Sequence, residues 1–217
     1  MNYMLHHQPV PTWSLFFGLI AASIWAVGRK VEHWKAATAV LFAAGAIAAY
    51  FVVGVMPAQT PETLGFIFVS GMLAVCAMIL PGISGAFILL ILGKYEYVIE
   101  TLENPFIIEH MMIIGVFVGG CAVGLVGFAR VLKFFLDRFR PQTLAFLTGL
   151  LLGSLRKIWP WKTPEVTRMI HGELRVVQES NILPEPGPGL VVPVLLMMLG
   201  FGAVIFLEWV SSRKAPE

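Results

Sequence analysis

Long apolar runs separated by short polar segments are the main pattern of this chain. A helix needs about 20 apolar residues to cross the roughly 30 Å hydrocarbon core of a bilayer, and several runs approach that length. They recur along the whole chain, so a cleaved signal peptide does not account for them. The pattern predicts an all-α, polytopic membrane helix bundle that occupies residues 1–217 as a single transmembrane domain. The expected spans are residues 13–28, 36–56, 107–128 and 190–210, with a shorter run at 143–157.

One apolar stretch, residues 64–92, is longer than an ordinary span and is interrupted by Pro81-Gly82-Ile83-Ser84-Gly85. Proline lacks an N–H and glycine permits turns that other residues resist, so the helix is expected to break there. Two topologies are open at this point. The stretch either crosses the membrane once, or it enters, turns at the break and returns as a re-entrant helical hairpin.

The charges of the flanking segments favour the hairpin. A single crossing would place the basic segment 129–141 outside the cell, although cytoplasmic loops carry the excess of Lys and Arg. The hairpin keeps this segment inside and the acidic segment 93–105 outside. Farther along, residues 160–189 mix charges of both signs with prolines, and we expect an aqueous loop with a short amphipathic helix near residues 166–177.

The composition excludes a soluble enzyme. Hydrophobic residues make up 58% of the chain and charged residues only 13%, whereas soluble domains are about a quarter charged. The formal net charge of +2 comes from cations between apolar runs, and no nucleic-acid-binding motif is present. Cys76 and Cys121 lie inside apolar runs without a CxxC motif or a histidine partner, so the sequence indicates no disulfide framework, metal site or cofactor.

The break at residues 81–85 is the first candidate for chemistry. Irregular backbone at membrane depth persists only where protein buries it or water reaches it, so a break there implies a site. A helix restarting after the break would aim unpaired N–H groups and the positive end of its dipole at one point, where Ser84 could cap it or bind a ligand. Phosphate suits such a site. The alternative is a proline kink whose glycines only allow close helix packing.

Cations at the ends of apolar runs are the second kind of candidate. Lys94 follows the expected hairpin, and Arg156 and Lys157 follow the short run. Each could bind an anionic headgroup, or could simply extend along the apolar surface to reach the membrane interface.

Three segments resemble one known family. The sequence MILPGISGAFILLILGKYEY, at residues 78–97, closely resembles the second-repeat signature of the DUF368 family of bacterial polyprenyl-phosphate transporters. The segments FFGLI at residues 16–20, with Ser23, and TGLLLGSLRKIWPW at residues 148–161 are similar to the same family. The three segments are spread over residues 16–161 of the 217.

The resemblance implies half of an inverted-repeat transporter fold in the bacterial cytoplasmic (inner) membrane, with several spans. The implied function is translocation of undecaprenyl phosphate, the lipid carrier of cell-wall precursors, so that it is recycled in cell-envelope synthesis. The implied partners are the polyprenyl-phosphate lipid and the bilayer, and assembly as a homo-oligomer stays open. No catalytic residue is implied. The expected substrate-binding residues are Pro81, Gly82, Ser84, Gly85, Lys94 and Arg156.

The chain also departs from the family pattern. The family carries an earlier Pro-Gly-x-Ser-Gly-Gly repeat, whereas this chain holds one such motif, so we expect it to lack the N-terminal repeat. Ala86 stands where the family commonly has a serine or threonine.

Two other functions compete with lipid transport. One is a membrane undecaprenyl-pyrophosphate phosphatase-like enzyme, because such enzymes also use a Pro-Gly-x-Ser loop. In them an arginine follows the serine and an acidic pair assists, whereas Gly85 follows Ser84 here and no acidic pair lies in an apolar run. The other alternative is a small-anion transporter or channel.

Overall fold

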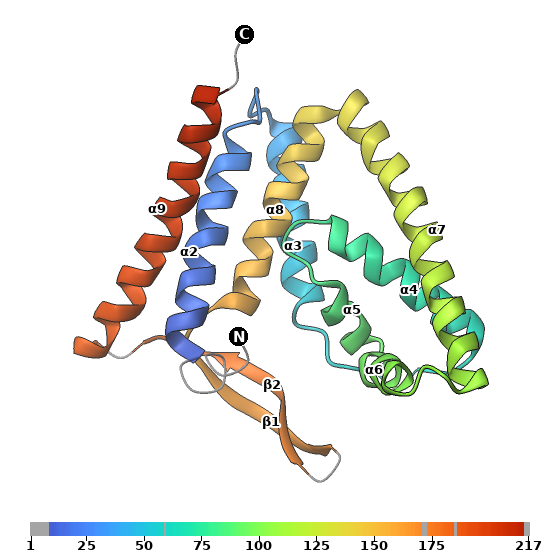
Figure 1. Cartoon of the computed structure of the whole chain (residues 1–217). Coiled ribbons are helices and arrows are strands. Elements are labelled where there is room, and N and C mark those ends of the chain that lie inside the picture. The colour runs from blue at the N-terminus through green and yellow to red at the C-terminus, as the bar shows by residue number, and fades with distance from the viewer. Residues whose placement is uncertain (1–8, 59, 171–172, 185, 215–217) are drawn as a thin grey trace.

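The computed structural model describes residues 9–58, 60–170, 173–184 and 186–214, which form a bundle of helices with one β-hairpin at its side (Figure 1). The predicted helical membrane bundle is confirmed. Among the described residues, three helices are long and apolar enough to cross a membrane, at Val10–Gly28, Ile108–Arg138 and Pro188–Ser211. The elements in chain order are α2 (Pro9–Gly28), α3 (Ala36–Val52), α4 (Leu64–Ile79), α5 (Gly85–Ile91), α6 (Tyr95–Glu103), α7 (Ile108–Arg138), α8 (Arg140–Ile158), β1 (Lys162–Ile170), β2 (Glu173–Asn181), η1 (Pro188–Leu190) and α9 (Val191–Lys214).

Glycines hold the helices together in pairs. Helices α2 and α9 meet where Gly18 faces the carbonyl oxygen of Met197, and Gly200 faces that of Leu15. A Cβ on Gly18 would overlap the Met197 oxygen, and one on Gly200 would lie 2.5 Å from the Leu15 oxygen. Small residues permit this close backbone approach, which is how helices associate in lipid. The same reciprocal contact joins α3 to α8 and α4 to α7, through Gly45 and Phe146, Gly149 and Phe42, Gly71 and Phe117, and Gly120 and Phe68.

Helices α4 and α5 form the predicted helical hairpin. Its tip is the turn at residues 80–84, in which Gly82 has a φ of 89°, a left-handed conformation that favours glycine. At its foot, the segment before α4 lies beside the end of α5, because Ala58 donates its N–H to the carbonyl of Ile91 at 2.9 Å. The Thr60 hydroxyl donates to the Leu92 carbonyl at the same place. The first arm therefore begins, and the second arm ends, at the same end of the molecule.

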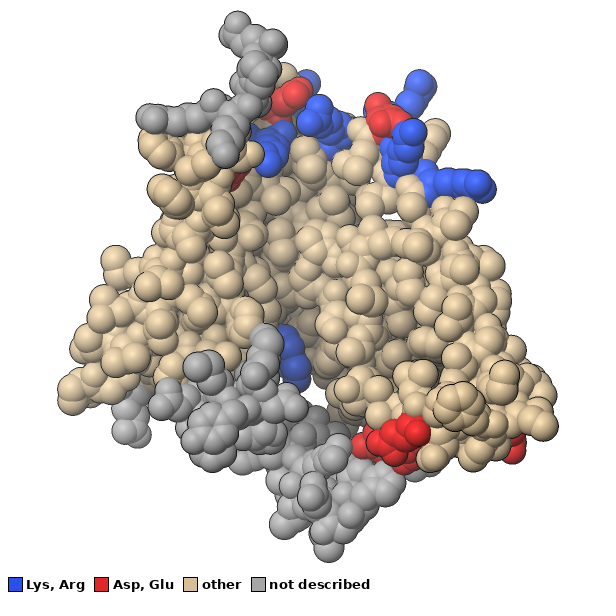
Figure 2. All heavy atoms as spheres, viewed as in Figure 1, with Lys and Arg blue, Asp and Glu red and all other residues tan. Residues whose placement is uncertain are grey.

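Charges of opposite sign gather at the two ends of the bundle (Figure 2). The end at which α2 and α7 finish, and α3 and α8 begin, is called the basic end. Its cations are Arg29, Lys30, Lys35, Lys133, Arg138 and Arg140. The opposite, acidic end holds the foot of the hairpin, α6 and the start of α7. Its carboxylates are Glu62, Glu96, Glu100, Glu103 and Glu109.

The region expected to be an aqueous loop with a short helix has a different structure. Residues 162–170 and 173–181 are antiparallel strands, so the helix expected near residues 166–177 is wrong. This stretch contains several β-branched residues, which favour strands over helices. The base of the hairpin is fixed by the Trp159 indole, which donates to the Ile182 carbonyl at 2.8 Å, and by the Ile182 N–H, which donates to Trp161 at 3.0 Å.

The glycine contacts predict that a glycine-to-alanine substitution lowers the free energy of unfolding only where the glycine touches a neighbouring helix. Gly149→Ala should lower the free energy of unfolding by about 1 to 3 kcal/mol, because its Cβ would overlap the Phe42 carbonyl and push α3 away from α8. Gly115→Ala is the matched control, since nothing lies within 4 Å of its Cβ and alanine favours the helix. Thermal unfolding in detergent measures both. Equal effects of the two substitutions would contradict the pairing.

Candidate functional site

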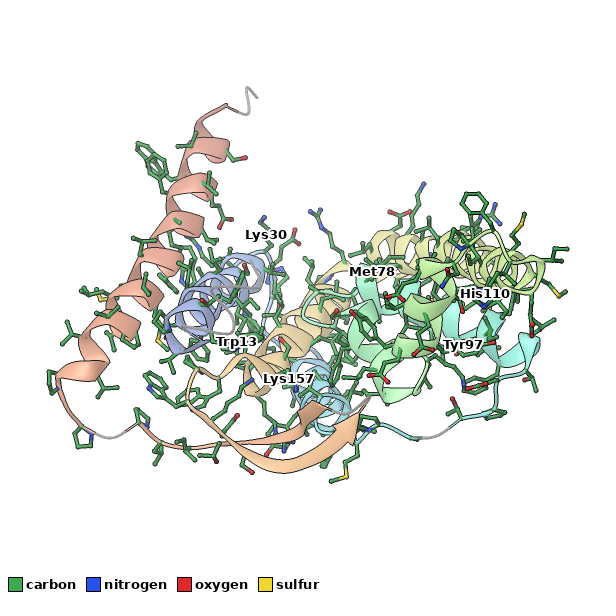
Figure 3. All side chains as sticks on the ribbon, turned by 60° about the horizontal axis from the view of Figure 1, so that its bottom comes forward. Trp13, Lys30, Met78, Tyr97, His110 and Lys157 are labelled. Carbon is green, nitrogen blue, oxygen red and sulfur yellow. The ribbon has the colours of Figure 1, made fainter. Side chains whose placement is uncertain are left out.

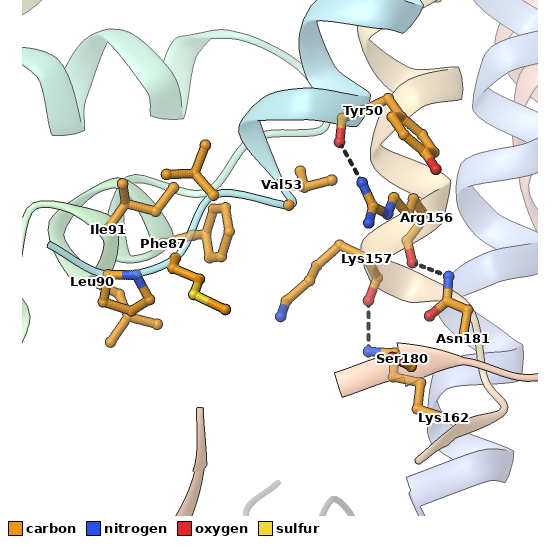
Figure 4. A pocket seen from close by; sticks show the side chains of 14 residues that line it. Tyr50, Val53, Phe87, Leu90, Ile91, Arg156, Lys157, Lys162, Ser180 and Asn181 are labelled. Carbon is orange, nitrogen blue, oxygen red and sulfur yellow. Dashed lines mark hydrogen bonds between the residues drawn. The ribbon is translucent and has the colours of Figure 1, made fainter. Parts of the chain in front are cut away.

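A pocket of about 510 Å³ opens at the acidic end, between the ends of α3 and α8, the short arm α5 and strand β2 (Figure 4). We call it the basic pocket. One wall carries the cations Arg156, Lys157 and Lys162, and the facing wall is apolar, with Phe87 and Ile91 of α5. The pocket therefore offers positive charge beside hydrocarbon.

The guanidinium of Arg156 is fixed by the end of α3. Its Nη1 donates to the carbonyl of Tyr50 at 3.1 Å, and its Cζ lies 4.2 Å from the centroid of the Tyr50 ring. Gly54 lies close by, because a Cβ there would be 2.7 Å from Nη1. A guanidinium has five N–H donors in a planar fork, so one backbone bond sets its orientation and leaves donors that can bind an oxyanion.

The β-hairpin joins the pocket at the last turn of α8. The ammonium of Lys162 donates to the Lys157 carbonyl at 2.7 Å, and the Asn181 amide donates to the Arg156 carbonyl at 2.8 Å (Figure 4). These bonds satisfy carbonyls that a helix end leaves unpaired. The ammonium of Lys157 lies 5.4 Å from the centroid of the Phe87 ring, across the pocket.

The tip of the α4–α5 hairpin packs against α8 at Ser154, two residues before Arg156. A Cβ on Gly82 would lie 2.7 Å from the Ser154 hydroxyl oxygen, so only glycine allows this contact. Ser154 is buried, and its hydroxyl donates to the Leu151 carbonyl at 2.8 Å. Gly85 packs inside the hairpin, where a Cβ would lie 2.6 Å from the Ala74 carbonyl oxygen.

The candidate Ser84 is the residue before the first turn of α5. Its side chain is exposed and makes no capping hydrogen bond to that helix. Pro81, beside it in the turn, is half-buried. The glycines of the tip thus serve close packing, while the binding roles expected for Pro81, Gly82, Ser84 and Gly85 stay predictions.

Lys94 lies at the foot of the hairpin. Its side chain is buried, with the residue 1% exposed, and its ammonium donates to the Thr60 carbonyl at 2.9 Å. The Glu62 carboxylate lies 4.0 Å away, and the centroid of the Tyr97 ring lies 5.5 Å away. Figure 3 shows Tyr97 well separated from Lys157. The structure therefore does not bring Lys94 to the pocket that Arg156 lines.

The surroundings of Tyr97 affect its own ionisation. Partial burial, followed by the charges of Glu62 and Glu109, raises the pKa of Tyr97 above its ordinary value. Each of these effects disfavours the phenolate. The Tyr97 side chain therefore faces the Lys94 ammonium as a neutral phenol at neutral pH.

Lys157 was a candidate cation but was not among the expected substrate-binding residues, and Lys162 was not a candidate. A signal for them exists in the charge pattern, because α8 begins beside the cations of the basic end and finishes with Arg156 and Lys157 at the acidic end. Cations at both ends of one span cannot both follow the positive-inside bias, so the pair at the end of α8 suggests a function. Within the described part of the chain, no three His, Cys, Asp or Glu side chains gather as metal ligands.

The fold and the basic pocket define a class: a helical membrane protein whose pocket suits an anion attached to hydrocarbon. Comparison with known proteins agrees, since the family described as undecaprenyl phosphate translocase-like matches residues 1–174. The chain belongs to that family.

Two curated relatives bear the name polyprenyl-phosphate transporter. The protein from Vibrio cholerae serotype O1 is 37% identical over 98% of this chain and 70% of its own length. The protein from Staphylococcus aureus is 29% identical over 73% of this chain and 61% of its own length. This chain thus spans between three fifths and three quarters of the length of these two relatives. No solved structure matches it.

The position of Lys94 predicts a structural effect. Lys94→Met should lower the free energy of unfolding by about 1 to 3 kcal/mol, because the partly buried Thr60 carbonyl loses its ammonium donor. Thermal unfolding in detergent measures the loss, with the exposed Lys133→Met as control. Unchanged stability together with lost binding of a phosphorylated lipid would instead make Lys94 a ligand residue.

Proposed function

We propose that this protein translocates polyprenyl phosphate, specifically undecaprenyl phosphate, across the bacterial cytoplasmic membrane for recycling in cell-envelope synthesis. The basic pocket would bind the phosphate. The observation that carries the proposal is the placement of Arg156, Lys157 and Lys162 opposite the apolar wall of α5. The names of the two relatives and of the family support it.

The charge distribution supports an orientation in a membrane crossed several times. Cytoplasmic segments carry the excess of Lys and Arg, so the basic end is cytoplasmic and the acidic end external. The basic pocket then opens on the external side. A carrier lipid is left with its phosphate on that side after its cargo has been delivered, so the pocket is suited to capture.

The lining of the pocket fits a phosphate on a long hydrocarbon chain. A guanidinium binds phosphate oxygens through two parallel N–H groups, and an ammonium adds a point charge. Phe87, Leu90 and Ile91 offer apolar contact for the first isoprene units.

The same lining favours binding over hydrolysis. Cleaving a pyrophosphate requires groups that supply or accept a proton, and no carboxylate or histidine is among the described residues that line the pocket. This supports a transporter over a phosphatase-like enzyme.

Arg156→Gln tests the site. A hydrogen bond to a charged partner contributes about 1.5 to 3 kcal/mol, so the substitution should weaken binding of polyprenyl phosphate roughly ten- to a hundredfold. Binding of the uncharged polyprenol should not change. Both affinities are measured with the protein in lipid nanodiscs, beside Arg29→Gln, an exposed arginine at the basic end.

Two results would contradict the proposal at different levels. Wild-type affinity of folded Arg156→Gln for polyprenyl phosphate would mean that the phosphate binds elsewhere. Equal affinity of the wild-type protein for the phosphate and the alcohol would remove the basis for phosphate-directed transport.

A further inference from the structure

A second cavity, of about 440 Å³, lies toward the basic end, where α7 and α8 meet. Figure 1 shows these two helices joined at that end and diverging from it, with the α4–α5 hairpin between them. We call this cavity the apolar groove. Its lining includes Leu80, Leu132, Phe135, Phe139 and Phe146.

The groove presents hydrocarbon to a ligand. Among the described residues, none of those that line it is charged. The hydroxyl of Thr143 is directed at the backbone, since it donates to the carbonyls of Phe135 at 3.1 Å and Phe139 at 2.9 Å. Such a surface offers little to a free anion, and it suits an aliphatic or isoprenoid chain.

The groove is bounded by polar features at both ends. Leu80, at one end, is the first residue of the hairpin tip, where the backbone leaves the helix. At the other end, Arg138 and Arg140 flank the lining residue Phe139 at the junction of α7 and α8. A hydrocarbon surface that ends at a junction carrying two exposed arginines is complementary to a lipid with a branched tail and an anionic head.

The hairpin tip separates the groove from the basic pocket. Leu80 faces the groove, whereas Phe87 and Ile91, beyond the tip, face the pocket. Along α8, the groove residue Phe146 and the pocket residue Arg156 are roughly 15 Å apart at about 1.5 Å rise per residue. The contact of Gly82 with Ser154 lies between them.

We propose that the apolar groove is a second binding site for polyprenyl phosphate, which holds an isoprenoid segment of the tail with the phosphate at the basic end, beside Arg138 and Arg140. This inference rests on the proposed function. The basic pocket is then the site on one side of the hairpin tip, and the groove is the site on the other.

Photo-crosslinking tests the occupant directly. The wild-type protein in nanodiscs is irradiated with a polyprenyl phosphate that carries a diazirine in its tail, and the labelled residues are mapped by mass spectrometry. The expected labels fall on Leu132, Phe135 and Phe146. Excess unlabelled polyprenyl phosphate should remove them, and the same excess of phosphatidylglycerol should not.

A pair of variants on α7 tests whether the lipid tail needs the empty space of the groove. Leu132→Trp should fill it and reduce the competable label on Phe146 by tenfold or more. Leu125→Trp is the matched control, because Leu125 is 49% exposed on the same helix and outside the groove, and its label should equal that of the wild type. If Leu132→Trp does not fold, the positions of the competable labels on the wild-type protein still decide whether the groove binds the tail.

The outcomes separate this inference from the proposed function. Competable labels confined to residues outside the groove would overturn the groove site and leave the transport proposal standing. Groove labels removed equally by phosphatidylglycerol would show bulk lipid there, which also overturns it. No competable label anywhere, together with equal affinity for phosphate and alcohol, would overturn the proposed function itself.

Discussion

Close contact between helix backbones at glycines is the constraint on which the rest of the structure depends. In lipid no hydrophobic driving force draws helices together, so association relies on van der Waals packing at short range. Gly149 shows the consequence, since it brings α8 against the backbone of α3 at Phe42. Because α8 is fixed in this way, the positions of Ser154 and Arg156 are fixed as well. The hairpin tip and the basic pocket therefore share one rigid support.

The sequence predicted the features that depend on local chemistry. The apolar runs indicated a helical membrane protein, and the proline and glycines at residues 81–85 indicated the break that makes the hairpin. Features that depend on pairing between distant segments were not predictable in this way. Lys94 appeared to be a candidate ligand because nothing local reveals its bond to Thr60, and Lys162 reaches the pocket only because of the β-hairpin. The β-hairpin was missed because the mixed charges of its sequence resemble those of a solvated loop.

The two cavities share a plan. Each has an apolar wall, and each is bordered by the α4–α5 hairpin. Cations line the basic pocket, whereas in the groove Arg138 and Arg140 are the sequence neighbours of the lining residue Phe139. The hairpin lies between the two cavities, which also share α3 and α8 as lining helices. Its foot is held by Ala58, Thr60 and Lys94, whereas its tip rests on α8 through the contact of Gly82 with Ser154.

The inclination of α7 leaves room for the hairpin inside the bundle. The 31 residues of α7 extend about 46 Å at 1.5 Å per residue, well beyond a hydrocarbon core of roughly 30 Å. Only residues 110–129, about 30 Å at the same rise, lack a charged side chain, so both ends of α7 extend beyond the core, and Figure 1 shows α7 inclined away from α8. The inclination opens a wedge between the two helices that the hairpin occupies. The inclination of α7 therefore sets the width of the wedge, and a more upright α7 would narrow the space in which the hairpin lies.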